Sequence, residues 1–326
     1  MPLIYSTHAL HPDAQARLER LGNFAVATKL SPETFVAEST KADLVIVRAS
    51  ISSDLIAAAR NLRAAMRHGA GLDMIPVDAC TMAGVLVTNV PGANAVTVAE
   101  YVIFSALALR RRFRMIDHDL RTEGWVEGRY HADFAGEISG AVIGIIGMGS
   151  IGRAIAKITA DGFSMRVLGH SRSNRNFPPQ VEPVTLDDLL QQSDIIALAC
   201  PLNDETRDII GAKQFSLMKP GALLINVSRG PVVVESALLE ALESGQLGGA
   251  ALDVFSEQPL PRDHPLFKFP NVTLTPHCAG ITEESMLRMG LVVADDAARI
   301  LNNELPANLR NPEAVESYRR RFPERA

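Results

Sequence analysis

The chain has 326 residues, of which 47% are hydrophobic and 21% are charged, and its formal net charge is −5. A chain of this length typically forms two domains, and this composition argues against wholesale disorder, collagen and coiled coil. The net negative charge also provides no general attraction for nucleic acid or for an acidic membrane surface.

The N-terminal sequence and the cysteines indicate a cytoplasmic protein. The first residues lack the basic region and apolar run of a signal peptide. The longest uncharged stretch, 79–99, contains Gly84, Pro91 and Gly92, which do not suit a membrane helix. The three cysteines are an odd number without metal-ligand spacing, so we expect neither a disulfide scaffold nor a metal site.

Apolar segments that predict strands alternate with helical patterns in the first part of the chain. The strands are expected at 3–5, 43–47, 64–67 and 85–88. A helical pattern without glycine or proline then runs from about 94 to 121, which predicts a single helix about 40 Å long. Such a helix either bridges two lobes or belongs to the core of one lobe. Residues 125–140 contain three glycines and are expected to form a loop or crossover.

A second regular series follows this loop. Its strands are expected at 141–146, 165–169, 195–199, 223–227, 249–252 and 272–275. A last long helix is expected at 283–303, followed by a charged surface tail at 316–325. Several strands are apolar on both faces, which predicts an α/β fold with a parallel sheet covered by helices on each side.

Residues 147–152 have the spacing of a dinucleotide-binding turn. Gly147, Gly149 and Gly152 form the pattern G-x-G-x-x-G between a buried-strand pattern and a helical pattern. Glycines let the backbone approach a pyrophosphate, and the N-terminus of the following helix offers N–H groups and a positive dipole end. The sequence therefore predicts a dinucleotide site here.

The residues after the second strand of this series favour NADP(H). No aspartate or glutamate occurs from 162 to 181, whereas Arg166, Arg172 and Arg175 do. Ser171 and Arg172 suit a 2′-phosphate, which a carboxylate at this place would repel. The alternative interpretation is a solvated loop with NAD(H) as the cofactor.

Seven segments in order along the chain resemble the D-isomer-specific 2-hydroxyacid dehydrogenase family, which includes glyoxylate/hydroxypyruvate reductases. They are 69–73, 94–100, 147–152, 201–207, 228–230, 252–255 and 276–277. The resemblance implies two doubly wound parallel-sheet domains, a flavodoxin-like substrate domain (1–98 and 288–326) and a Rossmann-type nucleotide-binding domain (99–287). It also implies a homodimer.

The resemblance implies roles for residues that follow the strands. Arg229 is expected to bind the keto acid, because a guanidinium fork can hold a carboxylate and polarise a carbonyl. His277 is expected to be the acid/base, since histidine is the residue best suited to transfer a proton near neutral pH. The substrate carboxylate is expected on backbone N–H groups of Ala70 and Gly71, with Ser50 as a weaker substrate-side candidate.

The same resemblance implies a set of cofactor contacts. Asp253 matches the residue that holds the nicotinamide carboxamide, and Ser150 and Ile151 match pyrophosphate contacts. The other residues expected at the cofactor are Thr97, Gly147, Gly149, Gly152, Ser171, Arg172, Pro201, Thr206, Val227, Ser228 and Gly280.

One position departs from the family pattern. The family usually has a glutamate that pairs with the histidine where this chain has Gln258, and Glu257 lies one residue early. A glutamine can orient the imidazole, but it cannot stabilise the imidazolium as a carboxylate does. A histidine–glutamine pair is also expected in formate dehydrogenases of this superfamily.

The leading expectation is an NADP(H)- or NAD(H)-linked reductase of small 2-keto acids such as glyoxylate or hydroxypyruvate. Two alternatives remain: oxidation of formate by the His277–Gln258 pair, and a non-catalytic, nicotinamide-sensing protein similar to the corepressor branch of the superfamily.

Overall fold

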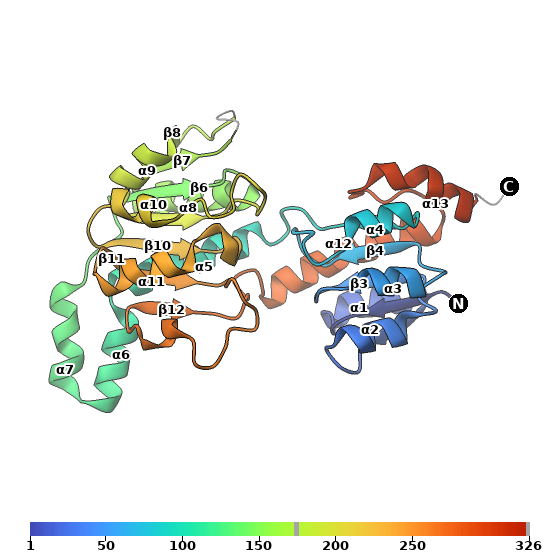
Figure 1. The fold of residues 1–326 in the computed structure, drawn as a ribbon, viewed down its shortest axis with the longest axis horizontal. Coiled ribbons are helices and arrows are strands. Elements are labelled where there is room, and N and C mark those ends of the chain that lie inside the picture. The colour runs from blue at the N-terminus through green and yellow to red at the C-terminus, as the bar shows by residue number, and fades with distance from the viewer. Residues whose placement is uncertain (173–175, 324–326) are drawn as a thin grey trace. The chain divides into compact units, whose positions relative to one another are not determined.

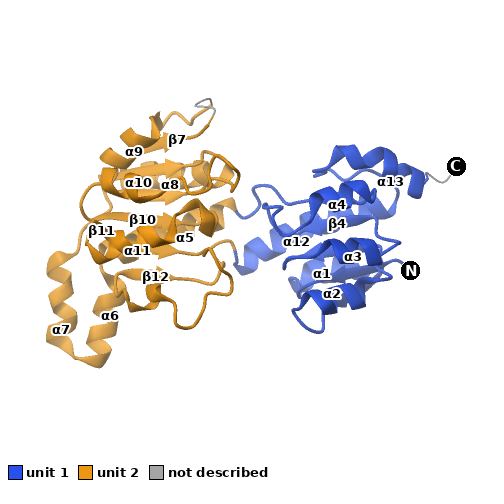
Figure 2. Ribbon diagram, in the orientation of Figure 1, with its two compact units in different colours: residues 1–94, 281–326 blue, residues 95–280 orange. Residues whose placement is uncertain are grey.

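The computed structural model describes residues 1–172 and 176–323. The chain divides into two compact units, Met1–Asn94 with Ile281–Ala326 (unit 1) and Ala95–Gly280 (unit 2) (Figure 2). The sequence suggested divisions after residues 98 and 287. Within the described ranges, no helix combines the length and apolar character needed to cross a membrane.

Unit 1 contains a parallel sheet of five strands with helices on both faces (Figure 1). Its strand order is β2-β1-β3-β4-β5, the flavodoxin-like order. The strands are β1 (Leu3–Ser6), β2 (Asn23–Val26), β3 (Leu44–Val47), β4 (Ala64–Arg67) and β5 (Leu86–Thr88). The helices are α1 (Pro12–Glu19), α2 (Pro32–Ser39), α3 (Ser53–Ala58), α4 (Val77–Met82), α12 (Glu283–Leu301), η4 (Pro312–Ala314) and α13 (Val315–Arg321).

Alternation along these strands divides the apolar side chains of unit 1 between two cores. Ile4 and Ile46 pack with Met289 of α12, whereas the neighbouring Tyr5 and Val45 belong to the core on the opposite face. The predicted surface tail is wrong in part, because it forms α13 and buries Tyr318 in the first of these cores.

Unit 2 contains a parallel sheet of seven strands in the order β12-β11-β10-β9-β6-β7-β8. Counted from β6, this is the Rossmann order with one additional edge strand. The strands are β6 (Val142–Ile146), β7 (Arg166–His170), β8 (Val181–Pro183), β9 (Ile195–Leu198), β10 (Ala222–Asn226), β11 (Leu247–Leu252) and β12 (Val272–Leu274). The chain order reverses between β6 and β9, so a ligand is expected beyond the carboxyl ends of these strands.

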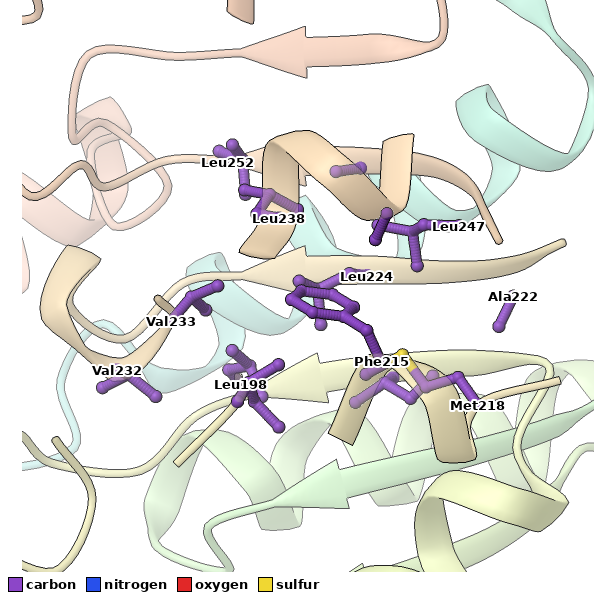
Figure 3. Close-up of a cluster of buried hydrophobic side chains, with 14 of the residues drawn as sticks. Leu198, Phe215, Met218, Ala222, Leu224, Val232, Val233, Leu238, Leu247 and Leu252 are labelled. Carbon is purple, nitrogen blue, oxygen red and sulfur yellow. The ribbon is translucent and has the colours of Figure 1, made fainter. Parts of the chain in front are cut away.

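Helices cover both faces of this sheet. α5 (Ala95–Arg110) and α8 (Ser150–Phe163) pack against each other on one face. The other core contains Leu198 and Leu224 of the sheet with Phe215 and Leu238 of the covering helices (Figure 3). Further helices of the unit are α9 (Leu186–Gln192), α10 (Ala212–Leu217), η2 (Gly230–Val232), α11 (Glu235–Glu243) and η3 (Pro265–Lys268).

The predicted continuous helix from 94 to 121 is wrong. α5 ends at Arg110, and Arg112 has a left-handed backbone (φ 51°) before α6 (Phe113–Thr122) begins. The expected loop at 125–140 contains α7 (Trp125–Tyr130) and η1 (His131–Phe134). α6 and α7 pack on each other and project from the sheet of unit 2 (Figure 1). We call residues 113–134 the arm.

Candidate active site

The turn between β6 and α8 forms a cradle with the shape that a pyrophosphate needs. Gly147 has φ +103°, and a Cβ there would lie 2.5 Å from the backbone nitrogen of Cys200. A Cβ at Gly152 would lie 2.0 Å from the carbonyl oxygen of Gly147. Gly149, in contrast, has no atom within 4 Å of its Cβ position. The outer two glycines therefore close the turn, and the middle one leaves room for a ligand.

The N-terminus of α8 supplies hydrogen-bond donors to this cradle. Gly149 is the N-cap residue, and no side chain caps the helix. The first N–H groups of a helix have no intrahelical acceptor, so those of Ser150 and Ile151 suit phosphate oxygens. These residues fit the pyrophosphate of a dinucleotide.

The end of β7 carries only part of the positive charge that the sequence suggested. Arg172 Nη1 lies 3.1 Å from Glu205 Oε2, and both side chains are exposed. Arg166 pairs with Glu182 at 2.8 Å, so its charge is neutralised between β7 and β8. Arg175 lies outside the described residues. Sequence reasoning missed Glu205 because this carboxylate comes from the segment after β9.

Thr206 and Thr97 have structural surroundings that the motifs did not reveal. Thr206 Oγ1 donates to the carbonyl oxygen of Pro201 at 2.6 Å and accepts from the N–H of Asn203 at 2.9 Å. Thr206 therefore closes the turn on which the exposed Pro201 lies. Thr97 is buried on α5.

The loop after β10 positions Arg229. Asn226 Oδ1 accepts from the N–H of Ser228 at 3.0 Å, and its Nδ2 donates to the carbonyl oxygen of Arg229 at 3.1 Å. The backbone of Gly230 presses against Phe255, where a Cβ would lie 2.0 Å from the carbonyl carbon. Val227 and Ser228 are buried beneath this turn.

Asp253 follows β11 and fixes the loop after β12. It is 2% exposed, and its carboxylate accepts from Thr275 Oγ1 at 2.7 Å and from the N–H groups of Cys278 at 2.8 Å and Ala279 at 2.9 Å. The backbone N–H of His277 donates to the carbonyl oxygen of Asp253 at 2.9 Å. One carboxylate thus organises the turn that carries the histidine, and motif spacing gave no sign of this.

His277 and Gln258 lie within hydrogen-bond distance. Nδ1 of His277 is 3.3 Å from Oε1 of Gln258, and Nε2 of Gln258 donates to the carbonyl oxygen of Phe255 at 3.3 Å. Because the second bond fixes the direction of the amide, His277 donates from Nδ1. Glu257 is exposed one residue earlier.

Ala70, Gly71 and Ser50 belong to unit 1. Asn89 Nδ2 donates to the carbonyl oxygen of Ala70 at 2.5 Å, and Arg67 Nε donates to that of Gly71 at 3.2 Å. These bonds use the carbonyl oxygens of the loop and not its N–H groups. Ser50 is exposed after β3, and Gly280 is partly buried at the end of unit 2.

Unit 1 also contains basic residues that sequence reasoning did not single out. His68 is 3% exposed, and burial together with Arg48 and Arg67 lowers its pKa to about 3. Burial and the same arginines lower the pKa of His8. His8, Arg48 and His68 follow β1, β3 and β4, and Arg67 is the last residue of β4, so all four lie at the carboxyl ends of the strands. Within the described part of the chain, no group of three or more metal-ligating side chains occurs.

Comparisons with known proteins show the family of this chain. Residues 103–279 match the family described as "D-isomer specific 2-hydroxyacid dehydrogenase, NAD binding domain". A glyoxylate reductase of Aeropyrum pernix is 37% identical over 96% of this chain and 97% of its own length.

Two solved structures share the fold over nearly the whole chain. The NADPH-dependent glyoxylate/hydroxypyruvate reductase of Sinorhizobium meliloti superposes with a TM-score of 0.84 at 26% identity and covers 100% of both chains. The NAD-dependent formate dehydrogenase of Staphylococcus aureus has a TM-score of 0.82 at 28% identity and covers 93% of this chain and 96% of its own.

The chain belongs to the D-isomer specific 2-hydroxyacid dehydrogenase family. It is an oxidoreductase, a 2-hydroxyacid dehydrogenase whose unit 2 is a nicotinamide-dinucleotide-binding domain.

Proposed function

We propose that this enzyme reduces small 2-keto acids of the glyoxylate or hydroxypyruvate type, with Arg229 binding the keto acid and His277 as the acid/base. The observation that carries the proposal is that these residues follow the carboxyl ends of neighbouring strands. Arg229 follows β10, Asp253 and Gln258 follow β11, and His277, which pairs with Gln258, follows β12. The glycine cradle after β6 lies at the same end of the sheet, which is where ligands bind in a doubly wound fold.

The side chains divide the reaction between them. The guanidinium of Arg229 holds the substrate and draws electron density from the carbonyl oxygen. When bound, the nicotinamide supplies the hydride that the carbonyl carbon receives. The oxygen then takes a proton from His277, and this proton comes from Nε2 because Nδ1 donates to Gln258. In the oxidative direction, neutral His277 takes the same proton back.

The cofactor contacts complete this proposal. The cradle and Ser150 and Ile151 hold the pyrophosphate, and Asp253 holds the carboxamide. The Oδ2 atom of Asp253 accepts a hydrogen bond from the N–H of Ala279, and a carboxylate oxygen has capacity for a further donor. We place the substrate carboxylate on the N–H groups of Ala70 and Gly71, with Ser50 as a weaker substrate-side candidate.

Purified protein tests the proposal directly. Oxidation of NADPH and of NADH is followed at 340 nm over a panel of glyoxylate, hydroxypyruvate and alkyl- or phenyl-substituted pyruvates. We expect turnover with at least one small member, and an Arg229→Gln variant should lose it. Tight cofactor binding without turnover of any keto acid would contradict the proposal.

We favour NADP(H) over NAD(H) as the cofactor. Ser171 and Arg172 follow β7, where a 2′-phosphate would lie, and the Sinorhizobium relative is named as NADPH-dependent. The 2′-phosphate would replace Glu205 as the partner of Arg172. The cofactor preference is measured as the ratio of kcat/KM for NADPH to that for NADH in the same panel.

Formate oxidation is the second candidate, because the hydrogen bond between His277 and Gln258 forms without a carboxylate. Hydride transfer from formate to NAD⁺ requires no proton transfer, so a neutral pair suffices. The test is production of NADH from formate and NAD⁺. Absence of NADH at high formate, together with keto acid turnover, rejects this candidate.

We further propose a homodimer formed through the arm. At its tip, Trp125 is 76% and Val126 72% exposed, between the exposed Glu123 and Glu127. The pocket at its base has a volume of about 610 Å³ and is lined by Phe134 and three arginines, without an acidic residue. The arginines are Arg110, Arg112 and Arg114. A twofold axis would place each acidic, apolar tip on the basic pocket of the other copy.

A cytoplasmic location is the last part of the proposal. The three cysteines, Cys80, Cys200 and Cys278, are free thiols, which suits a reducing compartment.

A further inference from the structure

A chain of hydrogen bonds joins α5 to the loop that carries His277. The hydroxyl of Tyr101 lies 2.6 Å from Thr275 Oγ1, and Thr275 Oγ1 donates to Asp253 Oδ1 at 2.7 Å. Tyr101 is on α5, Thr275 directly follows β12, and Asp253 directly follows β11. The chain therefore links three elements of unit 2.

The direction of these bonds follows from the donors available. A threonine hydroxyl has one hydrogen, and Thr275 gives it to the carboxylate of Asp253, which only accepts. The Tyr101 hydroxyl must therefore donate to Thr275. Burial raises the pKa of Tyr101, so the phenol keeps this hydrogen over the whole working range of an enzyme.

These hydrogen bonds end at Asp253, which holds the part of the loop next to the strained residue His277. His277 has φ 55°, a left-handed conformation that costs free energy for any residue except glycine. Such a conformation persists only where the surroundings impose it. Here Asp253 holds the N–H groups of Cys278 and Ala279, the two residues that follow His277.

We propose that Tyr101 is a positioning residue that acts on His277 through Thr275 and Asp253. The proposal rests on the function proposed above, because its catalytic effect requires His277 to be the acid/base. Tyr101 does not touch the reacting atoms. It keeps Thr275 turned toward Asp253, and Asp253 in turn keeps the backbone of His277 in its left-handed conformation.

The first experiment measures kcat and KM of single variants. Tyr101→Phe should lower kcat about fivefold, and Thr275→Val about 30-fold, because the threonine hydroxyl is bonded to a charged group. KM for the keto acid should change less than about twofold, since Arg229 keeps its surroundings. Thr275→Ser retains the hydroxyl and should retain most of the activity. An inactive Thr275→Ser variant would contradict the role of the hydroxyl.

The double variant tests whether the residues act as one chain. In the Thr275→Val background, Tyr101→Phe should cause no further loss of kcat, because its acceptor is already absent. If the loss of kcat in the double variant equals the product of the two single-variant losses, the proposal is overturned. Tyr318→Phe is the matched control. It removes a buried tyrosine hydroxyl that lies 3.4 Å from the carbonyl oxygen of Ile300 in unit 1, and it should leave kcat unchanged.

Hydrogen exchange gives a readout that does not depend on activity. Tyr101→Phe should raise the exchange rates of the Cys278 and Ala279 amides about tenfold, with the strands of unit 2 unchanged. If the wild type reduces no keto acid but this exchange rises, the function proposed above fails and the positioning of the loop stands. Unchanged exchange together with unchanged kcat would overturn the positioning proposal.

Discussion

At the scale of single residues, the side chain that pairs with His277 is an amide, where the family usually has a carboxylate. Gln258 holds Nδ1 at 3.3 Å but contributes no charge to stabilise an imidazolium. Gln258 thus orients the imidazole without the charge that would favour its protonated form.

Gln258→Glu should move the high-pH limb of the pH–rate profile for keto acid reduction to higher pH. The new carboxylate would stabilise the protonated imidazole that donates the proton, by about 1–2 kcal/mol for a partly exposed pair. The measurement is kcat against pH for both proteins. Glu257→Gln serves as the control, and an unmoved limb in Gln258→Glu would contradict the role assigned to Gln258.

Arg172→Gln should lower kcat/KM for NADPH about tenfold and leave that for NADH nearly unchanged, because only NADPH carries a 2′-phosphate. Glu205→Gln should improve NADPH use, since it removes the competing partner at 3.1 Å. Arg166→Gln is the matched control, because Arg166 is paired with Glu182. An equal loss with both cofactors would contradict the assignment of Arg172.

His68 should make stability depend on pH. Its pKa is about 3 in the folded protein against 6.5 when exposed, so the unfolded chain binds the proton more readily. The stabilisation is complete above pH 6.5 and is lost as pH falls toward 3, by on the order of 5 kcal/mol in total. Urea unfolding at several pH values should show a flatter dependence for His68→Gln. The exposed His118→Gln should behave like the wild type.

At the scale of elements, the closely packed and the open glycines of the cradle should affect different properties, the first the stability of the fold and the second the binding of the cofactor. Gly152→Ala should destabilise the protein by about 2–4 kcal/mol, because its Cβ would lie 2.0 Å from the carbonyl oxygen of Gly147. Gly149→Ala should keep the midpoint of thermal unfolding but weaken cofactor binding about tenfold, since its Cβ occupies the open cradle. Gly162→Ala, also in open space on α8, is the control for both. Equal effects of the first two would contradict the separation.

The elements also show which features the sequence could reveal. The predicted strands are all present to within two residues, since continuous apolar runs mark buried parallel strands. β2 and β8 were missed because neither is a buried apolar run: β2 has no buried residue, and β8 has two exposed residues out of three. The break at Arg112 carries no glycine or proline signal. At the site, family spacing indicated Arg229, Gln258 and His277, but the partners Glu205 and Tyr101 come from distant segments that only the folded chain brings close.

At the scale of the whole molecule, the arm predicts the state of assembly. Trp125→Arg should shift the protein from dimer to monomer in sedimentation equilibrium, because it places a positive charge against the three arginines of the pocket on the other copy. Met82→Arg is the matched control, since Met82 is 81% exposed on unit 1. A monomeric wild type, or a dimeric Trp125→Arg variant, would contradict the proposed interface.

Unit 1 contains residues from both ends of the chain, and this imposes an order on folding during synthesis. Residues 95–280 are contiguous, so unit 2 can complete its core as soon as it leaves the ribosome. The first 94 residues must wait for α12, because Met289 and Val293 complete the core around Ile4. At about 10 residues per second, this delay is about 20 s. The nascent first 94 residues therefore present an unfinished apolar face while unit 2 is synthesised and folds.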